Sequence, residues 1–221
     1  MRLMRSAEEL FIERGIDAVS MREINRHAGQ RNASSVHYHF ATRAKLLEAL
    51  IDWRMPPVDA RRLEMVELCK AAPAAEKPRR LTEAIVLPLA ETMFAQDPPN
   101  HWIRLHARIY ETGSFDFSAV FHGKGYDKGL LAVRMLQAEL SPELPQLIRD
   151  QRLMFAIRMS VYTLADWLRG VIRMQSLIPV DDLNIFLGNL LDVLHAGLYA
   201  PVTPFAVPAG AWRGAAGQIA G

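Results

Sequence analysis

The stretch that decides the fold is residues 20–50, SMREINRHAGQRNASSVHYHFATRAKLLEAL. Ser20 and Glu23 form a capping-box pattern, in which the hydroxyl accepts from an early amide while the carboxylate reaches back to the cap. Gly29 ends the short helix that this box begins, since glycine suits the end of a helix. After a polar stretch, Thr42 begins a longer amphipathic helix. The pattern therefore predicts a short capped helix, a turn, a short polar helix and a long helix.

A further helix is predicted upstream, with Leu3, Ala7, Leu10 and Phe11 on one face and Gly15 at its end. This order of elements is the layout of a helix-turn-helix. The first two helices make a small core that fixes the third. The third helix offers small polar side chains, so that its backbone can approach the major groove of DNA. The candidate reading helix is residues 32–39, with Val36 as its inward anchor.

This run resembles the DNA-binding domain of the TetR family of bacterial regulators. The resemblance covers residues 3–52 and rests on Ala28-Gly29, on Tyr38-His39-Phe40 and on the amphipathic helix that follows. Two departures stand out. Gln30 makes the turn one residue longer than the common family pattern, and His37 stands where a tyrosine is usual. An insertion at this point can tilt the reading helix, so the base contacts of the family do not transfer in detail.

Carried over by position, the resemblance implies two sets of DNA contacts. The residues expected at base edges are Asn32, Ser34 and Ser35. The residues expected at phosphates are Ser20, His37, Tyr38, His39, Arg43 and Lys45. Arg31 lies at the entrance of the reading helix and suits either role, because a guanidinium can contact guanine through two hydrogen bonds.

Charge and composition agree with a DNA-facing N-terminus. The net charge of the 221 residues is +2, and nine Lys/Arg against seven Asp/Glu place this surplus in residues 1–54, because the remaining 17 and 17 cancel. A surplus of two is weak evidence by itself, but its position favours a polyanionic partner. No apolar run approaches the ~18 residues of a membrane span. Glu8, Glu9 and Glu13 interrupt the first segment, so we expect no signal peptide and a cytoplasmic protein.

Apolar residues recur at helical spacing along the whole chain, which predicts an all-α fold. The predicted domains are a three-helix helix-turn-helix domain (1–52), a larger helical bundle for effector binding and dimerisation (53–200) and an irregular tail (201–221). Pro56-Pro57 is expected to interrupt or kink the helix that begins near Thr42, because proline removes backbone donors. Ser141-Pro142 predicts the start of a helix.

Methionine and aromatic residues concentrate in residues 93–121 and 153–167. Such residues usually form the core of a bundle, but with a few polar groups they also line ligand cavities. The candidate lining of an effector site is Trp102, His106, Tyr110, Phe121, Met154, Arg158 and Tyr162. The expected effector is small and largely apolar.

The two final helices carry apolar residues on more than one side, with Met154, Val171 and Ile172 beyond the main stripe. A helix in a monomer needs only one such stripe, so a second one indicates a partner helix. The resemblance implies a two-fold four-helix interface, which sets the reading helices of a homodimer about one turn of DNA apart.

The sequence thus predicts a homodimeric, ligand-responsive repressor of a palindromic operator in double-stranded DNA. The alternative is a helical small-molecule-binding protein without sequence-specific DNA binding. No metal, cofactor or enzymatic activity is expected. His37 and His39 point ~200° apart on a helix and cannot chelate one ion. The single Cys69 excludes a cysteine cluster, and FHGKGYDKG (121–129) lacks the Walker spacing of a phosphate-binding loop.

Overall fold

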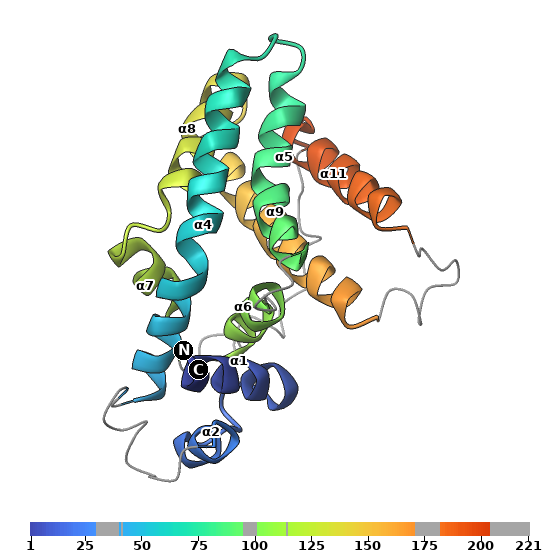
Figure 1. Cartoon of the computed structure of the whole chain (residues 1–221). Coiled ribbons are helices and arrows are strands. Elements are labelled where there is room, and N and C mark those ends of the chain that lie inside the picture. Colours follow the sequence, from blue (N-terminus) through green and yellow to red (C-terminus); the bar gives the residue numbers. More distant parts are fainter. Residues whose placement is uncertain (30–39, 41, 95–100, 114, 171–181, 204–221) are drawn as a thin grey trace, which may run out of the picture.

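The computed structural model describes residues 1–29, 40, 42–94, 101–113, 115–170 and 182–203. Over these residues all regular structure is helical, which confirms the predicted all-α class (Figure 1). In this part of the chain, no helix combines the length and the apolar character needed to cross a membrane.

Two short helices build the N-terminal core, α1 (Arg2–Arg14) and α2 (Met21–His27). The predicted capping box at the start of α2 is confirmed. The Glu23 N–H donates to Ser20 Oγ at 3.3 Å, and the Ser20 N–H donates to the Glu23 carboxylate at 2.8 Å. These hydrogen bonds lower the pKa of Glu23 to about 2, because they favour its charged form. Gly29 has a φ of +65°, a left-handed conformation that glycine adopts without strain.

The long helix α4 (Arg43–Ala71) begins at its predicted cap, where the Lys45 N–H donates to Thr42 Oγ1 at 3.2 Å. It runs unbroken through Pro56-Pro57, so of the interruption or kink expected there, the interruption was wrong. The two prolines remove backbone donors, but Met55 and Val58 on either side are both buried. Burial of such side chains holds the helix together across the missing hydrogen bonds. The predicted domain boundary at 52/53 falls inside this one helix.

The rest of the chain forms the larger bundle. Its elements are α5 (Lys77–Ala90), η1 (Glu91–Phe94), α6 (Trp102–Glu111), α7 (Phe117–Gly123), α8 (Lys128–Leu140), α9 (Gln146–Leu168) and α11 (Leu183–Tyr199). Helix α4 packs against α5 and α8, while α9 crosses behind them and contacts α5, α6, α8 and α11 (Figure 1). Helix α1 contacts α6 as well as α2 and α4, so the N-terminal helices pack directly on the bundle.

The predicted helix start at Ser141-Pro142 was wrong. Residues 141–144 form a turn closed by a hydrogen bond from Leu144 N–H to Ser141 O at 3.2 Å, and α9 begins at Gln146 after Pro145. The reason is the second proline. Pro145 disfavours the helical conformation of Leu144, so a helix begun at Pro142 ends before its first turn is complete.

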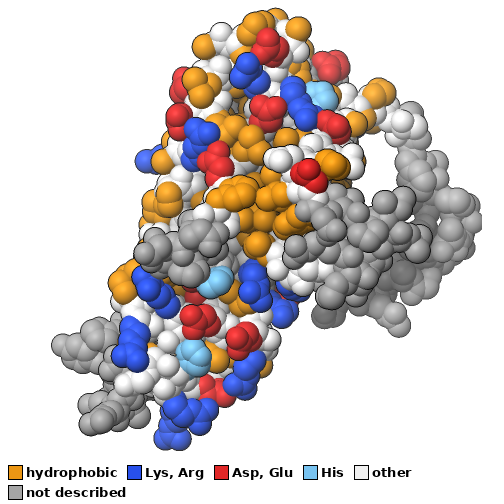
Figure 2. Space-filling model, turned by 45° about the vertical axis from the view of Figure 1, so that its right-hand side comes forward, with side chains coloured by type: hydrophobic (Ala, Val, Ile, Leu, Met, Phe, Trp, Pro, Cys, Tyr) orange, Lys and Arg blue, Asp and Glu red, His pale blue; other side chains and the backbone are white. Residues whose placement is uncertain are grey.

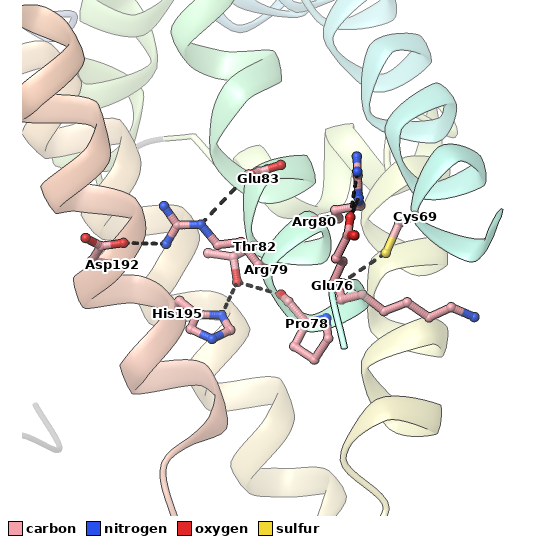
Figure 3. A network of polar contacts seen from close by, with 10 residues as sticks. Cys69, Glu76, Pro78, Arg79, Arg80, Thr82, Glu83, Asp192 and His195 are labelled. Carbon is pink, nitrogen blue, oxygen red and sulfur yellow. Dashed lines mark hydrogen bonds and ion pairs between the residues drawn. The ribbon is translucent and has the colours of Figure 1, made fainter. Parts of the chain in front are cut away.

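A polar network fixes α11 on α5 (Figure 3). Arg79 of α5 forms an ion pair with Asp192 of α11 at 2.5 Å. One turn further along α11, His195 Nδ1 lies 3.2 Å from the hydroxyl of Thr82, which also donates to Pro78 O. His195 therefore serves the packing of two helices.

Candidate DNA-binding and effector sites

The N-terminal helices lie at one end of the molecule (Figure 1). Seven of the predicted DNA contacts fall outside the described residues and remain predictions. They are Arg31, Asn32, Ser34, Ser35, His37, Tyr38 and His39. Ser20, Arg43 and Lys45 are described, and all three lie at the ends of the helices that flank the predicted reading helix.

The three described residues differ in how free they are to reach DNA. The Arg43 guanidinium donates to Val19 O at 3.0 Å and pairs with Asp17 at 3.3 Å, so it ties the start of α4 to the turn after α1. The Ser20 hydroxyl is engaged in the capping box. Among the described residues Lys45 pairs only with Glu48 of its own helix, and its side chain is 63 % exposed. Lys45 is therefore the most accessible of the three for a phosphate.

Further cations surround this end of the molecule. Arg2 and Arg5 of α1 and Arg22 and Arg26 of α2 are exposed. Lysine and arginine side chains are prominent on this end in Figure 2. The sequence analysis assigned none of these four arginines, although their helical spacing, at i and i+3 or i+4, places each pair on one face. Such a cluster favours a polyanion irrespective of its sequence.

A buried ion pair joins the N-terminal core to the bundle. Arg54 of α4 donates to both carboxylate oxygens of Glu8 of α1, from Nε at 3.1 Å and from Nη2 at 2.6 Å. Their side chains are 6 % and 1 % exposed. This two-point contact fixes α1 at a defined position along α4.

A second joint connects the N-terminal core to α6. The Arg108 guanidinium donates to Ile12 O at 3.2 Å, and the Thr112 hydroxyl donates to Asp17 at 2.7 Å. Asp17 also pairs with Arg43, so one carboxylate connects the end of α6 with the start of α4. The N-terminal core is thus held by two helices of the bundle.

The same two helices supply walls of a cavity of about 270 Å³. Its lining comes from α4 to α9 and consists of Met55, Arg62, Leu89, His106, Tyr110, Phe117, Ser118, Phe121, His122, Asp127, Leu130, Leu131, Arg134, Leu153, Met154, Ile157 and Arg158. Five of the predicted effector residues are brought together here, namely His106, Tyr110, Phe121, Met154 and Arg158. Trp102 and Tyr162 are not part of the lining. Their rings lie 4.9 Å from His106 and 6.2 Å from Tyr110, respectively.

His106 is the most unusual group in the lining. It is buried among the rings of Trp102, Tyr110 and Phe117, at centroid distances of 4.9, 4.6 and 4.8 Å. Neither ring nitrogen has a hydrogen-bond partner among the described residues. Burial, reinforced by the charge of Arg62, lowers the pKa of His106 to about 3. The imidazole is therefore neutral at physiological pH and presents one donor and one acceptor.

Arg62 was missed by the sequence analysis. It is 2 % exposed and lies on the buried face of α4 with Met55, Val58 and Val66. That spacing was the available signal, because an arginine in register with three core residues of a helix must point inward. Tyr110 also lines the cavity, and burial raises its pKa to about 12, so its hydroxyl stays protonated. Over the described residues, no three His, Cys, Asp or Glu side chains gather as metal ligands.

The comparisons with known proteins agree with this arrangement. Residues 3–50 match the family described as "Bacterial regulatory proteins, tetR family". No curated protein matches the sequence significantly. A solved structure with a similar fold is native NalD of Pseudomonas aeruginosa, described as the secondary repressor of the MexAB-OprM multidrug efflux pump. The likeness has a TM-score of 0.52 at 19 % identity and covers 91 % of this chain and 96 % of NalD. Residues 3–50 thus match the tetR family of bacterial regulatory proteins, and the chain as a whole has a fold similar to that of NalD.

Proposed function

We propose that this DNA-binding transcriptional regulator is a ligand-responsive repressor that acts as a homodimer on a palindromic operator. One observation carries the proposal. Two of the helices that wall the cavity, α4 and α6, also hold the N-terminal core, through Arg54–Glu8 and Arg108–Ile12. A ligand in the cavity therefore contacts the elements that set the position of the DNA-binding helices.

An apolar face on α9 and α11 supports the homodimer. Phe155 and Met159 of α9 and Ile185 and Val193 of α11 are large apolar side chains exposed to solvent. Figure 2 shows hydrophobic side chains gathered in the middle of the molecule, with charged groups above and below them. The two helices pack on each other through the stacked rings of Trp167 and Phe186, so they form a firm base for a partner.

This face differs from the one that the sequence suggested. Met154 lines the cavity, while Val171 and Ile172 lie outside the described residues. The proposed dimer contact therefore rests on the four exposed residues named above. Two copies of α9 and α11 across a two-fold axis give the four-helix interface expected of the family, and such a contact is isologous.

We expect Phe155→Asp to weaken the dimer by about tenfold or more, because it places a charge in the centre of an apolar interface. Leu68→Asp is the matched control, since Leu68 of α4 is an apolar side chain of similar exposure, 59 % against 63 % for Phe155, on another helix. Light scattering of the full chain over a range of concentrations measures the effect. A wild type that stays monomeric, or two variants that associate equally well, would contradict the proposed interface.

Coupling between the cavity and the DNA is proposed to run along α4. Met55 and Arg62 line the cavity, whereas Arg54 contacts α1. Pro56 and Pro57 lie between Arg54 and Arg62 and leave two carbonyls of the helix without their usual amide donors. A ligand that favours one bend of the helix at this point shifts the spacing of the two DNA-binding heads. It does so only if it binds one spacing more tightly than the other.

The proposal is tested by selection of random-sequence duplexes with the purified full chain. We expect enrichment of a palindrome whose half-sites are about one helical turn apart. Loss of all enrichment would contradict the proposal and would support a helical ligand-binding protein without sequence-specific DNA binding.

The enriched duplex also tests the assignment of contacts in the reading helix. Asn32→Ala is expected to relax the preference at one base pair of each half-site, because base-edge contacts specify sequence. Tyr38→Phe is expected to weaken binding to all sequences by a similar factor, because a phosphate contact carries no sequence information. Equilibrium binding to a set of singly substituted duplexes measures both effects, and the reverse pattern would refute the assignment.

A further inference from the structure

The cavity contains a buried cation that is only partly satisfied. Arg62 Nε donates to Ala84 O at 3.3 Å and Nη2 donates to Ile85 O at 3.5 Å, so α5 holds the guanidinium through two backbone carbonyls. Nη1 is buried as well, and among the described residues it has no hydrogen-bond partner. Because a buried N–H without an acceptor is costly, this donor calls for an acceptor that arrives from outside the chain.

The charge of Arg62 is also incompletely neutralised. Asp59, one turn earlier on α4, is the carboxylate that attracts it, but Asp59 Oδ1 is used by the Gly129 N–H at 2.8 Å. No carboxylate of the described residues lies within 4 Å of the Arg62 guanidinium. Burial lowers the pKa of Arg62 to about 10, which still leaves it charged at physiological pH. A buried cation of this kind is stabilised strongly by an anion.

A second unsatisfied donor faces the same cavity. The neutral His106 ring has no partner at either nitrogen within the described part of the chain, and one of them carries a proton. Arg62 and His106 are close enough for the arginine charge to oppose protonation of the imidazole. The two groups thus lie near each other in the lining of a cavity whose surface is mainly apolar.

The other charged side chains of the lining do not make the cavity negative or neutral. Arg134 is paired with Asp150 at 2.6 Å, and Asp127 is paired with His122. Arg158 lies over the ring of Tyr110 at 4.9 Å and forms no ion pair with a described residue. Even with Asp127 counted as one negative charge, Arg62 and Arg158 leave the lining of the cavity positive.

We infer that the cavity binds a compact apolar carboxylate, with its carboxylate group against Arg62 Nη1 and the His106 ring and its apolar body against Leu89, Phe121, Leu153 and Ile157. A carboxylate supplies acceptors for both unsatisfied donors and neutralises the buried charge. The volume of about 270 Å³ lies just below the usual range for ligand pockets of about 300–1,000 Å³, which favours a small molecule. The inference rests on the proposed function, because it names the chemical class of the effector.

The test compares matched acids and amides on the full-length protein by titration calorimetry. The probes are 2-naphthoate with 2-naphthamide, 4-phenylbutyrate with 4-phenylbutyramide, and decanoate with decanamide. We expect at least one carboxylate to bind about tenfold or more tightly than its amide. Arg62→Met is expected to abolish that preference, whereas Arg61→Met is expected to keep it, because Arg61 is on the outer face of α4 and pairs with Glu64 and Glu91.

If no carboxylate binds, or if acid and amide bind equally well to the wild type, the inference is overturned. The acid–amide comparison on the wild type decides this even where Arg62→Met fails to fold. Failure of the proposed function is a separate result. If a carboxylate binds preferentially but leaves the operator affinity unchanged, the inference about the ligand holds and the proposed ligand response is wrong. If acid and amide release the operator equally well, the ligand response holds and the inference about the carboxylate is wrong.

Discussion

Replacing Glu8 with Leu is expected to lower the free energy of unfolding by about 3–5 kcal/mol, because it leaves the Arg54 guanidinium buried without its carboxylate. Both side chains are at most 6 % exposed and the contact has two hydrogen bonds, at 3.1 and 2.6 Å. Removal of one partner costs far more than the pair contributes, since the remaining charge keeps its desolvation penalty. Arg54→Met, which strands the Glu8 carboxylate, is expected to cost a similar amount. Urea denaturation at a fixed protein concentration measures these changes.

The double variant Glu8→Leu/Arg54→Met separates a lost charge pair from lost packing. It is expected to be more stable than either single variant, because neither charge of the buried pair remains. The matched control is Glu76→Leu, which breaks a contact with Arg80 that also has two hydrogen bonds, at 2.9 and 2.7 Å, but lies on an exposed surface. Exposed pairs contribute about 0.2–1 kcal/mol. If either single variant of the buried pair lowers the free energy of unfolding no more than this control does, the contact between α1 and α4 is not held by charge.

Acidification from pH 7 to pH 5 is expected to remove about 2 kcal/mol of stability through His106 alone. The folded protein keeps this imidazole neutral, with a pKa of about 3, because the ring is buried and faces Arg62. The unfolded chain binds a proton near the ordinary histidine pKa of about 6.5. The free energy of unfolding therefore falls as the pH drops below about 6.5, because the unfolded chain then binds a proton at His106 that the folded protein does not bind.

His106→Phe is expected to remove this part of the pH dependence. The quantity to compare is the difference in unfolding free energy between pH 7 and pH 5, rather than either value alone, because the larger ring also changes the packing. His27→Gln, on the exposed surface of α2, is the control for removal of an imidazole. A difference that is the same in the wild type and in His106→Phe would mean that the ring is not kept neutral by the fold.

The N-terminal elements were predicted well because their boundaries depend on local chemistry. Ser20 and Glu23 are three residues apart and satisfy each other's backbone groups, and Thr42 does the same for the start of α4. Such contacts form wherever the sequence pattern occurs. The start of α9 was misplaced because Ser141-Pro142 is as good a local signal as Leu144-Pro145, and only the competition between the two prolines decides it.

The effector cavity was predicted in part. His106, Tyr110 and Phe121 attract notice as polar and aromatic residues among apolar neighbours, and they do share the cavity. Arg62 was not predicted as a lining residue, because arginine is almost never fully buried and the groups that hold it belong to another helix. Ala84 O and Ile85 O, 22 and 23 residues along the chain, become its acceptors only once α5 packs on α4. The spacing of Arg62 with the core residues of α4 signals that it points inward, but it does not reveal which groups of another helix will hold it.

The central claim, that the chain recognises a specific DNA sequence, is tested most directly by its affinity for the enriched palindrome and for a scrambled duplex of the same composition. Fluorescence anisotropy of the full chain at 50 and 200 mM salt gives the four equilibrium constants. We expect binding to the palindrome to be on the order of a thousandfold tighter or more, and both affinities to fall steeply with salt as phosphate contacts release counterions. Equal affinity for the two duplexes would contradict the account and would assign the molecule to ligand binding without sequence-specific DNA recognition.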